Sequence, residues 1–159
     1  KILLNAYLIP DKREKLNMKK KRVLIAENDP DHIELLVEEL KVIDTKKETI
    51  IKKDGLEVMD YFKQPNTNTN VDKWLQIDLI ILDLNLPEIH GMEVLRYLKN
   101  DTKYRLIPVI IFLNTSDTKT ISEVYEKGAN GFITKPASFN EFRENIKKLK
   151  KYLLDSDTQ

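Results

Sequence analysis

Short apolar runs alternate along the chain with segments in which apolar side chains recur at helical spacing. The runs are rich in Val, Ile and Leu, and polar or turn-forming residues bound them. Runs of this length and composition are typical of β-strands. The run 77–82 is apolar almost throughout, which indicates a central strand covered on both faces. The five predicted strands are 22–26, 48–54, 77–82, 107–113 and 130–134.

A helical pattern follows each of these runs. After the first run, Asp29 is expected to cap a helix that has Pro30 in its first turn. Its apolar positions repeat at i, i+3, i+4 and i+7, as on the buried face of a helix. These positions are Ile33, Leu36, Val37 and Leu40. Further helices are predicted at 55–62, 91–100, 119–128 and from Ser138 onward.

Two of these helices also carry end signals. Ser138 and Glu141 have the spacing of a capping box, and Gly128 is expected to end the helix at 119–128. Five strands that alternate with five helices predict an α/β fold, a doubly wound five-stranded parallel sheet with right-handed crossovers. We expect this domain to span residues 20–154.

The remaining segments are interpreted as additions to that domain. Residues 63–74 are rich in Asn and Thr and predict a long loop or insertion, in which Trp74 is expected to fill core space. Residues 1–19 are interpreted as an N-terminal extension, flexible or non-native upstream of Met18; the alternative is a short helix packed on the domain. Residues 155–159 are expected to form a tail.

Composition narrows the function. The 159 residues carry a formal net charge of +1, which argues against nucleic acid as the main partner. Cysteine is absent, so disulfides, thiolate chemistry and Cys-based zinc sites are excluded, and two isolated histidines make a His-rich metal cage unfavourable. Every apolar run is far shorter than the roughly 20 residues of a membrane helix. We therefore expect a soluble, cytoplasmic protein.

Polar residues of complementary chemistry end three of the predicted strands. The first strand runs into Glu27, Asn28 and Asp29, the third into Asp83, and the fifth into Lys135. In doubly wound folds ligands bind at the carboxyl ends of the strands. Oxygen ligands there suit Mg²⁺, and a lysine opposite would balance the charge of a phosphoryl group, which predicts phosphoryl transfer. An acid after a single strand is more often a turn or helix cap, but here three strands contribute.

These residues carry a resemblance to a known family. From about Lys20 to Leu154 the chain resembles the receiver domain of two-component response regulators. The matching segments are VLIAENDPDHIELL, DLIILDLNLPEIHGMEVL, IPVIIFLNTSD and GANGFITKP. The D-x-x-x-P-x-x-x-G spacing of Asp83, Pro87 and Gly91 is specific. The insertion and the LDLNLP segment are most similar to single-domain receivers that partner bacterial phytochromes. The resemblance implies a flavodoxin-like fold.

The resemblance also implies roles for individual residues. Asp83 matches the phosphoacceptor, which takes a phosphoryl group from a phosphohistidine of a sensor histidine kinase, of phytochrome type if the closer likeness holds. Glu27 matches a Mg²⁺ ligand, and Asn85 matches the position whose backbone carbonyl binds the metal. Lys135 matches the lysine that pairs with Asp83, and Phe132 matches the aromatic switch position.

Two positions depart from the family pattern. Asn28 stands where a second acid usually binds the metal, so we expect weaker Mg²⁺ binding, with Asp29 as helix cap rather than substitute ligand. Leu113 stands where receivers carry Thr or Ser, and leucine donates no hydrogen bond. Thr115 would replace that hydroxyl only if the loop shifted its register.

Three functions follow from these observations. The first is a phosphoaccepting signalling module that acts by protein–protein contact through the face of 119–128, 130–134 and the last helix. The partner at this face is another protein or, as a homodimer, a second copy of the chain. The second, motivated by Asn28 and Leu113, is a degenerate receiver that binds partners independently of phosphorylation. The third, an aspartyl-phosphate phosphatase, is disfavoured because Asp83 lacks the second acid of that motif. His32 could face the site, but the favoured expectation is a solvated helical residue, and His90 is expected to be a loop residue.

Overall fold

The computed structural model of the chain describes residues 21–43, 47–64, 77–114, 117–135 and 138–153. The predicted N-terminal extension, Trp74 with most of the insertion, Thr115 and the tail lie outside the described residues. The expectations for them therefore stay predictions.

The predicted sheet is confirmed. Five parallel strands form one sheet in the order β2-β1-β3-β4-β5. Every residue of β3 and β4 is buried, which explains their unbroken apolar sequences. The strands are β1 (Arg22–Ala26), β2 (Glu48–Lys52), β3 (Leu79–Asp83), β4 (Val109–Leu113) and β5 (Gly131–Thr134).

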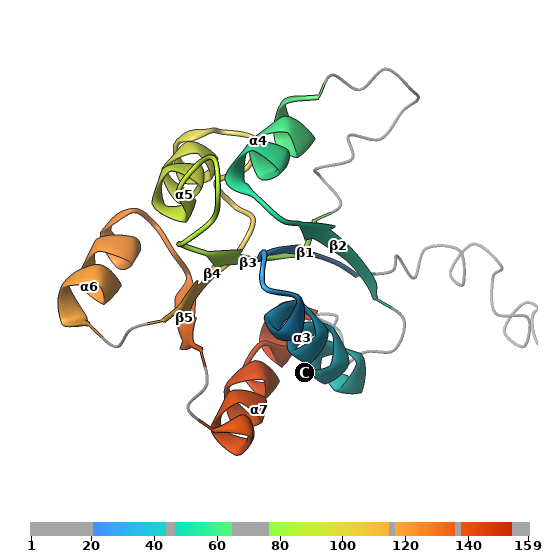
Figure 1. Cartoon of the computed structure of the whole chain (residues 1–159). Coiled ribbons are helices and arrows are strands. Elements are labelled where there is room, and N and C mark those ends of the chain that lie inside the picture. Colours follow the sequence, from blue (N-terminus) through green and yellow to red (C-terminus); the bar gives the residue numbers. More distant parts are fainter. Residues whose placement is uncertain (1–20, 44–46, 65–76, 115–116, 136–137, 154–159) are drawn as a thin grey trace, which may run out of the picture.

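Helices cover both faces of this sheet (Figure 1). They are α3 (Pro30–Ile43), α4 (Gly55–Lys63), α5 (Gly91–Asn100), α6 (Thr118–Glu126), α7 (Phe139–Lys147) and α8 (Lys150–Leu153). In Figure 1, α4 and α5 lie on one side of the sheet, and α3 and α7 lie on the other. No helix within the described ranges is long and apolar enough to cross a membrane.

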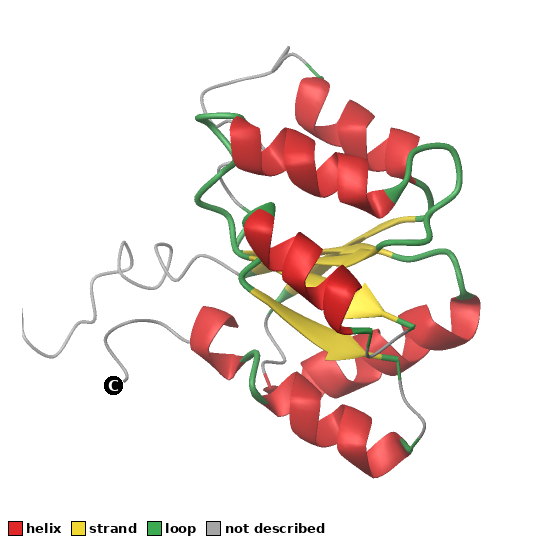
Figure 2. Cartoon of the chain, turned by 90° about the vertical axis from the view of Figure 1, so that its left-hand side faces the viewer, coloured by secondary structure: helices red, strands yellow, loops and turns green. Residues whose placement is uncertain are grey.

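The last predicted helix is divided in two, so that six helices stand in the described residues where five were predicted. The α-helical pattern stops at Lys147, and the amide of Leu149 then donates to the carbonyl of Ile146 at 2.9 Å, a tighter i→i+3 bond. The apolar spacing of Phe142, Ile146, Leu149 and Leu153 is unchanged by the break, and all four are buried. Figure 2 shows the short α8 beyond the end of α7.

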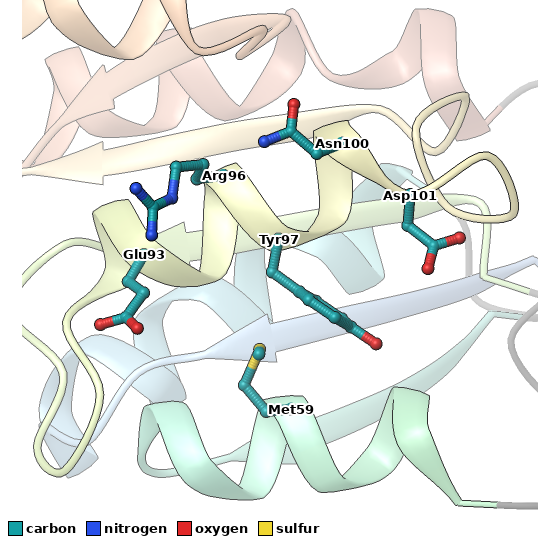
Figure 3. A pocket seen from close by; sticks show the side chains of 6 residues that line it. All are labelled: Met59, Glu93, Arg96, Tyr97, Asn100 and Asp101. Carbon is teal, nitrogen blue, oxygen red and sulfur yellow. The ribbon is translucent and has the colours of Figure 1, made fainter.

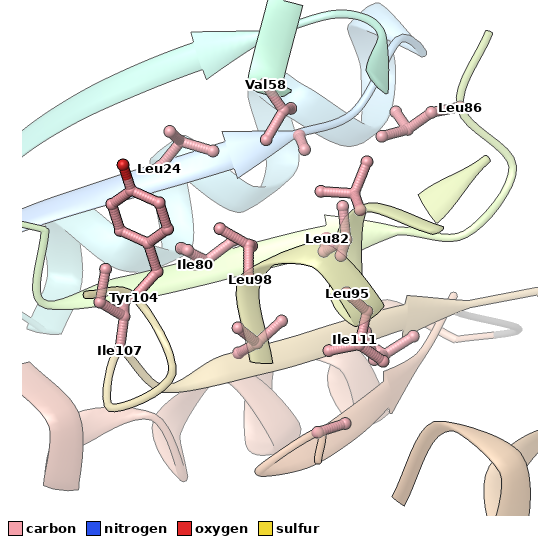
Figure 4. Packing of buried hydrophobic residues seen from close by; sticks show 14 of the residues in the cluster. Leu24, Val58, Ile80, Leu82, Leu86, Leu95, Leu98, Tyr104, Ile107 and Ile111 are labelled. Carbon is pink, nitrogen blue, oxygen red and sulfur yellow. The ribbon is translucent and has the colours of Figure 1, made fainter. Parts of the chain in front are cut away.

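Alternating side chains of the strands form two apolar clusters, one on each face of the sheet. Leu24, Ile80 and Ile111 belong to the cluster under α4, α5 and α6, as Figure 4 shows. Val23, Ile81 and Phe112 belong to the cluster under α3, α7 and α8. Each fully buried Leu or Ile contributes about 1.5–3 kcal/mol relative to an exposed one. The sheet is therefore stabilised by apolar packing on both of its faces.

The predicted helix ends are confirmed. The Asp29 carboxylate accepts a hydrogen bond from the amide of Asp31 at 2.9 Å, and Ser138 Oγ accepts one from the amide of Glu141 at 3.3 Å. Gly128 follows α6 with φ of +96°, the left-handed conformation that favours glycine after a helix. His90 has a more specific role than a loop residue, because its Nδ1 accepts from the amide of Met92 at 3.1 Å and caps α5.

Gly91 brings α5 close to the end of β3. A Cβ at this position would lie 2.2 Å from the carbonyl oxygen of Asp83, so only glycine fits. Its amide donates to the carbonyl of Leu84 at 2.8 Å. The spacing of Asp83 and Gly91 in the sequence thus reflects a close contact of Gly91 with the backbone of Asp83 and Leu84.

Candidate functional site

Three predicted site residues meet at the carboxyl edge of the sheet. Asp83 is the last residue of β3, Glu27 directly follows β1, and Lys135 directly follows β5. The carboxylates are almost completely buried, at 0% exposure for Glu27 and 1% for Asp83. Parallel pairing through β1, β3, β4 and β5 places these strand ends side by side.

Lys135 bridges the two acids. Its Nζ lies 2.9 Å from Asp83 Oδ2 and 3.1 Å from Glu27 Oε2. The backbone amide of Lys135 donates to the carbonyl of Leu113 at 2.6 Å, which fixes the start of the side chain against β4. Buried charges are costly unless they are paired. One cation between two carboxylates leaves the cluster with a formal charge of −1.

Loop amides hold the remaining carboxylate oxygens. Asp83 Oδ1 accepts a hydrogen bond from the amide of Asn85, and Glu27 Oε1 accepts one from the amide of Asp29, each at 3.1 Å. In each carboxylate, one oxygen therefore accepts a hydrogen bond from a backbone amide, and the other lies beside Lys135. This arrangement fixes the orientation of the Asp83 carboxylate.

The expectation that His32 is a solvated helical residue is wrong. Its Nδ1 lies 3.7 Å from Glu27 Oε1 and 3.5 Å from Asp29 Oδ2, and its ring meets Phe112 edge-on at 5.7 Å. His32 stands three residues after the cap Asp29, a spacing that returns a helical side chain to the same side. That spacing was the signal available in the sequence.

The charge at Asp29 is stabilised by its role as cap. The pKa of Asp29 is lowered, chiefly because the amide of Asp31 donates to its carboxylate, with a smaller contribution from His32. The neighbouring Asn28 is exposed. Asp29 is thus occupied at the helix end, in line with the expectation that it caps rather than replaces the acid missing at position 28.

A divalent cation would find two buried carboxylates here. Oε2 of Glu27 lies 3.1 Å from the Lys135 ammonium group and accepts no hydrogen bond from a backbone amide of the described residues. Two carboxylates with nearby amide and carbonyl oxygens match the ligand preference of Mg²⁺. No three His, Asp or Glu side chains of the described segments converge as a ready-made metal cage. The donor chemistry therefore fits a cation held largely by water and by two acids.

The side chain of Leu113 belongs to the apolar cluster on the other face of the sheet. Its side chain is 2% exposed and packs in the cluster under α4, α5 and α6. Phe132, the predicted switch residue, is partly buried, and its ring meets Tyr125 of α6 at 6.1 Å in an edge-on contact. The hydroxyl expected from the family pattern is absent at position 113, and apolar packing occupies its place.

The described surface also has hollows outside this edge. A hollow of about 360 Å³ lies between α4 and α5 (Figure 3). A second one, of about 220 Å³, lies along β5 between α6 and α7, where Tyr125, Phe132 and Lys148 line it. Neither includes Glu27, Asp83 or Lys135 in its lining.

Comparison with protein families gives one clear match. The model of the response regulator receiver domain matches residues 23–147. The response regulator Rcp1 of Synechocystis sp. is 28% identical over 138 residues, which cover 87% of this chain and 92% of that protein. The polar-differentiation response regulator DivK of Brucella ovis is 34% identical over 100 residues, which cover 63% of this chain and 73% of DivK.

Solved structures agree with these sequence matches. The phosphorylated cyanobacterial phytochrome response regulator RcpA is similar with a TM-score of 0.74 at 30% identity, over 86% of this chain and 96% of RcpA. The Mn²⁺-bound form of Rcp1 is similar with a TM-score of 0.73 at 28% identity, over 86% of this chain and 96% of Rcp1.

Proposed function

This chain belongs to the response regulator receiver family of phosphorylation-based two-component signalling, and from that premise we propose that Asp83 accepts the phosphoryl group. The donor would be a phosphohistidine of a sensor histidine kinase. The observation that supports this most strongly is the 2.9 Å contact between Lys135 Nζ and Asp83 Oδ2 at the sheet edge. A buried carboxylate held beside a buried ammonium is arranged for a phosphoryl group that brings additional negative charge.

The transfer exchanges one bond for another. A carboxylate oxygen of Asp83 forms a bond to phosphorus while the bond between phosphorus and the kinase imidazole nitrogen breaks, and its electron pair stays on the imidazole. The Asn85 amide orients the Asp83 carboxylate by donating to Oδ1. Lys135 is close enough to pair with the transferred group, because its Nζ already lies between both acids. The Asn85 amide and Lys135 would stay beside the phosphoryl group when water later hydrolyses it from Asp83.

A divalent cation would complete the charge balance. Glu27 and Asp83 would hold it, with the backbone carbonyl of Asn85 and, more weakly, the amide oxygen of Asn28. The ion, which we propose is Mg²⁺, would neutralise charge on the phosphoryl oxygens. The solved Rcp1 structure contains Mn²⁺, so a relative of this chain binds a divalent cation. Because Asn28 contributes no charge, we expect weaker cation binding than two acids would give.

Output would be protein–protein contact in the cytoplasm. The surface of α6, β5 and α7 holds Phe132, Tyr125 and the hollow beside them. We propose this surface for the output partner or a second copy of the chain. The likeness to RcpA supports a kinase of the phytochrome type as donor, because RcpA is described as a phytochrome response regulator.

One alternative has a specific observation in its favour. Leu113 is buried in apolar packing, so position 113 has no hydroxyl that could donate a hydrogen bond to the phosphoryl group. A receiver that binds its partner regardless of phosphorylation would tolerate this change. In that case, partner binding would be the same for the wild type and the Asp83→Asn variant.

Chemical phosphorylation tests the proposal. The protein is incubated with a small phosphodonor, with and without Mg²⁺, and its intact mass is measured. We expect one added phosphoryl group on the wild type with Mg²⁺ and none on Asp83→Asn. The matched control Asp78→Asn changes an acid just before β3 and should be labelled normally. An unlabelled wild type under saturating donor would contradict the proposed acceptor.

A further inference from the structure

The side chain of Phe112 lies against the ammonium group of Lys135. Lys135 Nζ is 5.1 Å from the centroid of the Phe112 ring. Phe112 is fully buried, and the Lys135 side chain is 10% exposed. The electron-rich face of an aromatic ring attracts a cation, and the attraction is stronger where water is excluded. The ring is therefore a third partner of Lys135 besides the two carboxylates.

The backbone places this ring at the level of the site. Phe112 is the residue of β4 in register with Asp83 of β3 and with Ile133 of β5, two positions before Lys135. Strand alternation turns its side chain away from the cluster that holds Leu113 and into the one under α3 and α7. Phe112 and Leu113, although adjacent, thus face opposite sides of the sheet.

Other rings restrict the position of Phe112. The ring of Phe142 in α7 lies 5.9 Å away, and His32 in α3 meets Phe112 edge-on at 5.7 Å with an interplanar angle of 73°. Phe142 is fully buried. Contacts from two helices leave the Phe112 ring little freedom to turn. A fixed ring holds the cation beside it in a fixed place.

We infer that Phe112 is a positioning residue for Lys135, which keeps the ammonium group directed at Asp83 when a phosphoryl group arrives. The inference rests on the proposed function for the phosphoryl step. A hydrophobic residue of another shape would fill the space but would not attract the cation. The part played by Phe112 is therefore electrostatic as well as steric, and the two parts are separable.

Fluorinated phenylalanines at position 112 separate the electrostatic part of its role from the steric part. Fluorine withdraws electron density from the ring face but changes the shape of the ring little, so mono-, di- and trifluorinated residues at position 112 weaken the attraction in steps. The matched control is the same series at Phe62, a buried ring that packs with Tyr61 and Tyr104 in the other cluster. Phe112→Tyr keeps the aromatic face, and Phe112→Leu removes it.

Two readouts are measured on the folded protein. The first is the chemical shift of Lys135 Cε and Nζ, which we expect to change progressively along the series at position 112 and not at position 62. The second is the rate of Asp83 labelling by a small phosphodonor, which we expect to fall about threefold to tenfold across the series. Phe112→Leu should resemble the most fluorinated variant, and Phe112→Tyr should resemble the wild type.

The outcomes distinguish this inference from the proposed function. Lys135 signals and labelling rates that stay constant along the series at position 112 would overturn the positioning role while leaving Asp83 as acceptor. Lys135 signals that follow the series, in a protein that no donor labels, would support the positioning role and contradict the acceptor. Equal changes in the Lys135 signals and labelling rates for the series at positions 62 and 112 would also overturn the positioning role.

Discussion

At the carboxyl edge of the sheet, the two faces carry different kinds of side chain. Towards α3 and α7, Lys135 joins Asp83 and Glu27, and its ammonium group lies against the buried ring of Phe112. Towards α4, α5 and α6, the side chain of Leu113 is buried among apolar residues. The first side retains groups that suit phosphoryl transfer, and the second lacks the hydroxyl that would report it. Chemistry and response are therefore separable in this molecule.

The largest effect is expected from removing the cation. Lys135→Met would leave two buried carboxylates without the ammonium group that bridges them, which we expect to lower the free energy of unfolding by about 3–5 kcal/mol. Urea unfolding measures the change. Adding Glu27→Gln to Lys135→Met should restore most of the loss, because only one acid then remains. A loss below about 1 kcal/mol would show that the bridge contributes little to stability.

A second prediction concerns Leu113, on the face of the sheet towards α4, α5 and α6. Leu113→Thr introduces a hydroxyl into an apolar cluster and removes packing, so we expect it to lower the free energy of unfolding by about 1–3 kcal/mol. Leu113→Val is the matched control, because it keeps the branched shape without the hydroxyl. We expect Leu113→Thr alone to increase the response of Phe132 to phosphorylation, as seen in its amide chemical shift. An identical response in both variants would contradict the role assigned to position 113.

A third prediction restores the acid that the site lacks. Asn28→Asp adds one negative charge close to Glu27, and we expect it to tighten binding of Mg²⁺ about tenfold, or about 1.4 kcal/mol. Isothermal titration measures the affinity. Asn28 is exposed, so the unfolding free energy should change by only about 0.5 kcal/mol. Unchanged Mg²⁺ affinity would place the cation away from this strand end.

The smallest effect is expected at a helix cap beyond the site. The pKa of Asp117 is lowered, chiefly by a hydrogen bond from the Thr120 hydroxyl, and then by the amides of Thr120 and Lys119. Because the folded-state pKa lies below the unfolded one, this contribution is complete above about pH 5 and is lost as the pH falls through the lowered value. Urea midpoints of the wild type and Asp117→Asn should therefore converge under acid. A constant difference between pH 7 and about pH 3 would contradict this linkage.

The order of elements and the polar strand ends were readable from the sequence, because each depends on local pattern. The run that ends at Asp83 is apolar on both faces, and parallel sheets align their carboxyl ends. The same reasoning placed Glu27 and Lys135 at one edge, and the structure brings their charged groups within 3.1 Å.

Orientation and long-range packing were not readable in the same way. The favoured expectation placed His32 in solvent, yet it lies beside Glu27, because the predicted cap at Asp29 brings position 32 back to the strand end, a consequence that the apolar pattern does not show. The contact of Phe112 with Lys135 joins residues from two strands, and an apolar run does not show which ring will meet a cation. The break between α7 and α8 leaves the apolar spacing intact and therefore gave no signal.

The central claim is that the acceptor side keeps Asp83, Glu27 and Lys135 in contact, while the response side is weakened by Leu113. Backbone amide spectra of the wild type and Leu113→Thr, recorded with Mg²⁺ before and after addition of beryllium fluoride as a phosphoryl mimic, test it most directly. We predict that the amides of Glu27, Asn85 and Lys135 shift in both proteins, whereas those of Phe132 and Tyr125 shift clearly more in Leu113→Thr. Wild-type shifts at Phe132 and Tyr125 as large as those of Leu113→Thr would contradict the account.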